Sequence, residues 1–155
     1  MTVKTTRLLR WSLFGLLVVL GVSQLVPIDR SNPPSDPGRD ITARLSPPPP
    51  VAAAFERSCR DCHSYQTRWP WYSRVAPISW VVAEDVKDGR RNLNFSEWAA
   101  YDQSRAAAKL QDICDEVTSG DMPDFKYTLI HRQAVLSPQE VSAICDWAKT
   151  ARPGR

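Results

Sequence analysis

Side chains that bind metals through nitrogen or sulfur are scarce in this chain. Its 155 residues include two histidines, four cysteines and two methionines, one of which is Met1. Residues 51–155 also show almost none of the alternating apolar pattern that is typical of β-strands. The missing strand pattern argues against a thioredoxin-like βαβ unit. The small number of histidines and cysteines limits the sites that the chain can build.

The C-terminal two thirds of the chain have no excess of positive or negative charge. The whole chain carries a net charge of +3, but residues 51–155 hold 14 basic and 14 acidic side chains. This part has no basic stripe, so the sequence predicts no nucleic-acid partner. The basic excess lies in the N-terminal 50 residues, and residues 1–28 contain no acid.

Residues 11–28 form an uncharged, mostly apolar run that follows Lys4, Arg7 and Arg10. Eighteen residues are about the minimum for a membrane-spanning helix. Basic residues before the run favour a cytoplasmic N-terminus and export of the rest of the chain. The alternative is a cleaved signal peptide, but the run has no Ala-x-Ala site and continues beyond Ser23. We therefore predict a basic tail with a retained membrane anchor over residues 1–28.

Residues 29–50 contain seven prolines and end in four consecutive ones. Proline fixes φ and lacks an amide donor, which predicts an extended, partly polyproline II linker. At about 3.1 Å per residue, such a linker spans as much as ~70 Å. Residues 51–155 then form a single small domain.

Helical patterns dominate that domain. The first predicted helix runs from Val51 to about His63, and the second begins at Pro77 and ends at Gly89. A third, long helix begins near Ser96 and ends at Gly120. Ser137 and Glu140 form a capping box that opens a fourth helix, which ends before Pro153. The predicted fold class is all-α, a small helical domain behind its anchor and linker.

Cys59-Arg60-Asp61-Cys62-His63 is the most informative motif in the chain. The spacing C-x-x-C-H is the attachment signature of c-type haem. On a helical turn the two thiols and the imidazole lie at i, i+3 and i+4, on one face. The thiols can then add to the haem vinyl groups while His63 binds the iron. A redox dithiol or another metal site are the alternatives.

Met122 is the candidate for the second axial ligand. It lies on a predicted loop between Gly120 and Pro123. A thioether is a soft, neutral ligand, and His/Met ligation raises the reduction potential of a haem. The alternatives are that Met122 fills a gap in the core and that His131, the other histidine, binds the iron instead.

The motif stands in the stretch CRDCHS at 59–64 and is followed by WPWYS at 69–73, APISW at 76–80, LNFSEW at 93–98 and Met-Pro at 122–123. Together these stretches resemble the bacterial haem-binding domain family, whose members are membrane-anchored, exported, cytochrome-c-like proteins with one CxxCH. The resemblance covers essentially all of residues 51–150. It implies one haem c, covalently attached at Cys59 and Cys62, with His63 as proximal ligand. It also implies a single-pass protein of the bacterial inner membrane, with its haem domain in the periplasm and its haem attached by the cytochrome c maturation machinery.

Two groups of residues keep alternative interpretations. Trp69, Trp71, Tyr72 and Trp80 either line a haem pocket or belong to the ordinary core. The remaining cysteines, Cys114 and Cys145, lie on two predicted helices. In an oxidising compartment two such cysteines most often form a disulfide, and the alternative is a pair of buried, inert thiols.

Three functions compete at this point. The favoured one is a membrane-tethered carrier of single electrons between redox partner proteins in or at the membrane, and not an enzyme. The second is a haem-based sensor or small-ligand binder whose sixth ligand is displaced. The third is a thiol oxidoreductase that uses Cys59 and Cys62 without haem.

Overall fold

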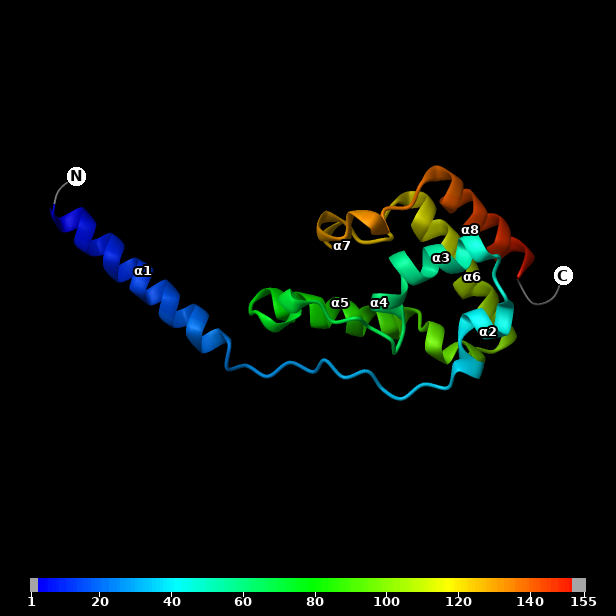
Figure 1. Ribbon diagram of the computed structural model, residues 1–155, viewed down its shortest axis with the longest axis horizontal. Helices are drawn as coiled ribbons and strands as arrows, with labels where there is room; N and C mark the ends of the chain where they lie inside the picture. Colours follow the sequence, from blue (N-terminus) through cyan, green and yellow to red (C-terminus); the bar gives the residue numbers. More distant parts are fainter. Residues whose placement is uncertain (1–2, 152–155) are drawn as a thin grey trace. The chain divides into compact units, whose positions relative to one another are not determined.

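The computed structural model describes residues 3–151, and over these residues the chain is helical, with no β-strand (Figure 1). The all-α prediction is confirmed. The α-helices are α1 (Val3–Ser23), α2 (Ile41–Leu45), α3 (Pro49–Ser58), α4 (Arg60–His63), α5 (Ile78–Asn92), α6 (Gln103–Ser119), α7 (Phe125–Ile130) and α8 (Pro138–Thr150). Four short 3-10 helices lie between them: η1 (Pro37–Arg39), η2 (Trp71–Arg74), η3 (Phe95–Ala100) and η4 (Arg132–Ala134).

The chain divides into two compact units. The first joins the N-terminal residues up to Ser31 with the segment Trp69–Asp85, so it contains α1, η2 and the first half of α5. The second joins Asn32–Arg68 with the chain from Val86 onward. It contains the C-x-x-C-H motif and both remaining cysteines.

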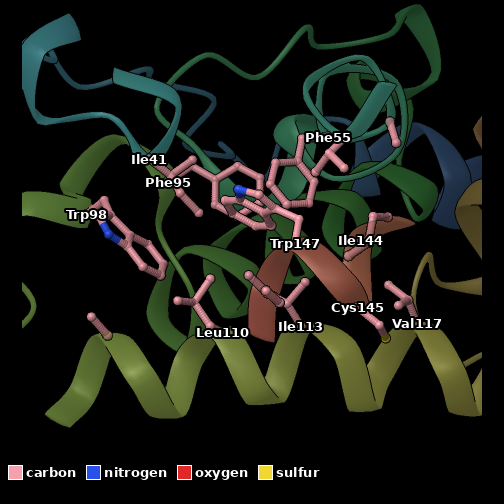
Figure 2. Close-up of a cluster of buried hydrophobic side chains, with 14 residues drawn as sticks. Ile41, Phe55, Phe95, Trp98, Leu110, Ile113, Val117, Ile144, Cys145 and Trp147 are labelled. Carbon is pink, nitrogen blue, oxygen red and sulfur yellow. The ribbon is translucent and has the colours of Figure 1, made fainter. Parts of the chain in front are cut away.

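The hydrophobic core of the second unit lies where α3, α6 and α8 pack together (Figures 1 and 2). Phe55 of α3 is fully buried and stands at the centre of an aromatic cluster. Its ring centroid is 5.1 Å from that of Phe95 and 5.3 Å from that of Trp147. Leu110 and Ile144 cover the cluster from α6 and α8.

Helix ends in this unit follow local sequence signals. Gly120 ends α6 with φ at 83°, in the left-handed region that favours glycine. Ser137 caps α8, and Glu140 completes the predicted capping box. Cys114 of α6 and Cys145 of α8 are joined by a disulfide, with their Cα atoms 4.8 Å apart.

The prediction that residues 29–50 form an extended linker is wrong for much of that range. Asp36 and Asp40 cap η1 and α2 with their side chains, so this Pro-rich segment folds into short helices. Ile41 is fully buried in the core of the second unit. The last two residues of the four-proline run, Pro49 and Pro50, open α3, because the fixed φ of proline suits the first helical positions. The compact unit therefore begins at Asn32, well before residue 51.

Three helix boundaries also differ from the prediction. The third predicted helix begins at Gln103 and not near Ser96, since the 3-10 helix η3 precedes α6 as a separate element. The first predicted helix is broken at Cys59, whose backbone (φ −125°, ψ −39°) ends α3 and opens α4. Gly89 does not end the second predicted helix, since α5 continues to Asn92. The break and the interior glycine both lie at the C-x-x-C-H motif.

Helix α1 is the one described helix that is long and apolar enough to cross a membrane. Its window Thr6–Ser23 has a mean hydropathy of 1.4, and none of it is buried against the rest of the protein.

Candidate haem site

A single turn of helix carries the C-x-x-C-H motif. The backbone N–H of Cys62 donates to the carbonyl of Cys59 at 3.2 Å, and that of His63 donates to the same carbonyl at 3.0 Å. The two thiols and the imidazole therefore belong to one turn, as the spacing predicts. Because the helix is broken at Cys59, this turn does not continue along the axis of α3.

Arg60, the first residue between the cysteines, anchors the turn to the interior. Its guanidinium donates to both carboxylate oxygens of Asp40, at 2.8 and 3.2 Å, and both side chains are 8% exposed. Burial opposes ionisation of Asp40, but hydrogen bonds from Arg60 and Thr42 outweigh it and lower its pKa. Asp40 thus caps α2 and holds the motif at the same time.

Asp61, the second residue between the cysteines, anchors the turn on its other side. It accepts hydrogen bonds from Arg68 Nε at 3.1 Å and from the Tyr127 hydroxyl at 2.8 Å. Burial, followed by the bond to Asp61, raises the pKa of Tyr127. The Tyr127 hydroxyl therefore stays protonated and ties α7 to α4.

The imidazole of His63 is oriented by backbone carbonyls of α5 and the residue that follows it. Its Nδ1 lies 3.0 Å from the carbonyl oxygen of Gly89 and 3.1 Å from that of Leu93. Because carbonyls only accept, Nδ1 carries the proton and Nε2 carries the lone pair. Burial lowers the pKa of His63 despite these two bonds. A neutral imidazole fixed in this tautomer is the form that binds a metal ion, and such a carbonyl partner is common among metal-binding histidines.

Gly89 explains how α5 comes so close to the motif. A Cβ atom at this position would lie 2.6 Å from the carbonyl oxygen of Cys62 and 3.0 Å from its carbonyl carbon. Only glycine fits this approach, because the obstacle is backbone. One residue further, Arg90 donates to the carbonyl of Ser64 at 2.8 Å and so fixes the chain that leaves the motif.

Neither Cys59 nor Cys62 forms a disulfide, in contrast to Cys114 and Cys145. Burial, followed by the neighbouring Cys62, raises the pKa of Cys59 to about 12. Reactive cysteines of dithiol oxidoreductases have lowered pKa values. The environment of Cys59 is the opposite, so it argues against the thiol oxidoreductase interpretation. The donor set of two thiols outside any disulfide and an oriented neutral imidazole fits a covalently held haem.

Met122 lies on the short loop between α6 and α7. Its N–H donates to the carbonyl of Glu116 at 3.1 Å, and its side chain is 37% exposed. It is therefore not a core-filling methionine. His131 ends α7 and stacks on the ring of Tyr127, with ring centroids 4.4 Å apart.

The described part of the chain contains no group of three or more His, Cys, Asp or Glu side chains placed to hold a metal ion. The interpretation of the motif as part of such a metal site finds no support there.

The aromatic residues of the 69–80 segment belong to the first compact unit, whereas the motif belongs to the second. Trp71 is 76% exposed and Trp80 is 40% exposed, so neither is an ordinary core residue. Trp69 and Tyr72 are half-buried.

Sequence reasoning missed the residues that hold the motif in place, namely Asp40, Gly89, Leu93 and Tyr127. A glycine inside an otherwise helical pattern is a known signal of close backbone approach, and Gly89 carried that signal. Leu93 acts through its carbonyl, which no side-chain pattern reveals. Asp40 and Tyr127 act across long sequence separations.

Comparison with known proteins gives one result that bears on this site. The model of the haem-binding domain family matches residues 18–150. No significant match was found among the curated proteins or among the solved structures. The matched range includes the C-x-x-C-H turn, the carbonyls of Gly89 and Leu93 that orient His63, and the loop of Met122. On that match, this chain belongs to the haem-binding domain family.

Proposed function

We propose that this protein is a membrane-tethered, exported c-type haem protein that carries single electrons. The observation that carries the proposal is the orientation of His63 beside two cysteines that form no disulfide. Its Nδ1 is held by the carbonyls of Gly89 and Leu93, so Nε2 can bind iron. Cys59 and Cys62 lie on the same turn as His63, and neither is part of a disulfide.

The two cysteines and the histidine of the motif have distinct roles in this proposal. A bound haem supplies an iron that alternates between two oxidation states. The S–H bonds of Cys59 and Cys62 would add across two vinyl C=C bonds of a haem, and the resulting thioethers would prevent its loss. His63 would supply the proximal ligand, and its carbonyl partners keep the imidazole from rotating and keep its proton on Nδ1.

Met122 is the proposed sixth ligand, with His131 as the alternative. The Tyr127–Asp61 bond attaches α7 to the helix that carries the motif, and Met122 lies on the loop leading into α7. The exposed surface of α7 is unusually apolar, and its Phe125 is 74% exposed. A haem bound beside α7 would cover such apolar side chains and keep water away from the iron.

The proposed location is the inner membrane, with the haem domain in the periplasm. Helix α1 is apolar and long enough to span a bilayer. Basic residues precede it, which favours a cytoplasmic N-terminus. The Cys114–Cys145 disulfide is consistent with an oxidising compartment. Redox partners would then be proteins in or at the same membrane.

One observation favours a second function, that of a haem-based sensor or small-ligand binder. Met122 is partly exposed on a loop, so its sulfur is a ligand that a small molecule can displace. In that case the reduced protein binds carbon monoxide readily, and binding shifts the Soret band.

The test uses full-length protein made with the cytochrome c maturation machinery, in a reduced and an oxidised sample. An electron carrier gives a sharp low-spin spectrum in both states and resists carbon monoxide. The Met122→Ala variant should keep its haem but bind carbon monoxide, and the matched variant His131→Ala should behave like the parent. Rapid carbon monoxide binding by the parent protein would favour the sensor instead. An identical spectrum for Met122→Ala would remove Met122 from the site.

A further inference from the structure

The first compact unit fixes a short segment of the exported chain against the end of α1. Gln24 follows the last residue of that helix, and its side chain bonds Ala76 twice. The Gln24 amide donates to the carbonyl of Ala76 at 3.1 Å, and the N–H of Ala76 donates to Gln24 Oε1 at 3.0 Å. Nearby, Arg30 donates to the carbonyl of Ser73 at 3.3 Å. The segment 69–83 is thus attached to the helix end.

That attachment determines the depth of the segment if α1 spans the bilayer. The membrane-spanning window of α1, the 18 residues Thr6–Ser23, rises about 27 Å, which is close to a hydrocarbon core about 30 Å thick. Gln24 then lies among the lipid headgroups, in a layer about 5–7 Å deep. Ala76 lies at the same depth because it is hydrogen-bonded to Gln24.

The side chains around Ala76 have the composition of an interfacial surface. Segment 69–83 contains no acidic residue, and Arg74 is its one charged residue. Its large apolar side chains are exposed instead of packed: Trp71, Val75, Ile78, Trp80 and Val81. Tryptophan and tyrosine concentrate at membrane interfaces because their rings are apolar with one polar atom.

The change along α5 shows that this exposure is confined to one end of the helix. In its first turn, the exposed positions Ile78 and Val81 are apolar. Further along, the exposed positions Glu84, Lys87 and Arg91 are charged. A helix in water throughout would have no reason for this switch, whereas a helix that begins at a lipid surface would.

We propose that segment 69–83 lies on the outer surface of the bilayer and inserts its exposed aromatic and aliphatic side chains among the lipids. Arg74 faces the phosphates of the same leaflet. This surface and α1 together hold the exported chain at the membrane. The inference rests on the proposed tether, and it adds a second, peripheral contact with lipid to the single spanning helix.

The experiment uses the full chain in phospholipid bilayer discs, with the photoreactive residue p-benzoylphenylalanine at one position at a time. Positions 71 and 78 test the surface, and Leu16 of α1 tests the anchor. Glu84, exposed on the same helix as Ile78, is the matched control. After illumination, covalent lipid adducts are measured by mass spectrometry.

The proposal expects adducts at positions 16, 71 and 78 and none above background at 84. An adduct at 16 without adducts at 71 and 78 would overturn the surface while leaving the tether in place. Adducts at 84 equal to those at 78 would also overturn it, because the contact would not be confined to this end of α5. Loss of the adduct at 16 would remove the tether and the surface with it.

Discussion

Replacing Gly89 by alanine tests whether the close approach of α5 orients the motif. In a solvent-exposed helix, replacing glycine by alanine stabilises the folded protein by about 1 kcal/mol, since alanine has the higher helix propensity. Here the new Cβ would stand 2.6 Å from the carbonyl oxygen of Cys62. Overpacking against backbone costs about 1–3 kcal/mol. The shift of α5 would also weaken the bond from His63 Nδ1 to the carbonyl of residue 89, at about 1 kcal/mol.

The net expectation for Gly89→Ala is a loss of about 1–3 kcal/mol in the free energy of unfolding, from the three terms together. Urea denaturation followed by circular dichroism measures it. The variant Lys87→Ala, exposed on the same helix, should change stability by no more than about 0.5 kcal/mol. A Gly89→Ala protein that is more stable than its parent would refute the reasoning, because it would show that α5 has room for a side chain there.

Three further predictions concern other parts of the second unit. The Met122→Ala variant should retain covalent haem and gain carbon monoxide binding, as recorded by absorption spectra of the reduced protein. Replacing Cys114 and Cys145 together by serine should cost about 3–4 kcal/mol in chemical denaturation, because the disulfide closes a long loop, and an unchanged midpoint would contradict this. The backbone N–H of Ser137, then the ion pair with Arg57, lower the pKa of Glu140 to about 2. Its contribution to stability should be complete above pH 4.5 and disappear as the pH falls towards 2, because the unfolded chain binds the proton first. Stability measured against pH should lose this acid-side slope in the Glu140→Gln variant.

The parts of this fold that were predictable are those with strong local signals. The capping box of Ser137 and Glu140 predicts the start of α8, and Gly120 predicts the end of α6. The C-x-x-C-H spacing places its three side chains on one turn without any knowledge of the fold. These features depend on residues within a few positions of one another, which is the range over which sequence patterns are informative.

The parts that were missed depend on contacts between distant segments. Ile41 follows a proline-rich stretch, and only its burial in the core, on a helix that packs against η3, shows that residues before 51 belong to the domain. In the sequence, Asp40 resembles an ordinary helix cap on the surface. Its bond to Arg60, 20 residues later, is a tertiary contact that the local pattern does not reveal. The sequence predicts a helix end at Gly89, because glycine commonly ends helices. The competing reason, a close backbone contact with Cys62, is tertiary.

Covalent attachment of haem is the central claim, and the most direct test is the intact mass of the full chain. The protein is made with the cytochrome c maturation machinery, denatured and analysed by mass spectrometry, with peptide mapping of the modified segment. The account predicts the mass of one added haem on the peptide that contains Cys59 and Cys62, and its loss when both are replaced by alanine. An unmodified mass, obtained while a control cytochrome matures normally in the same cells, would contradict the account.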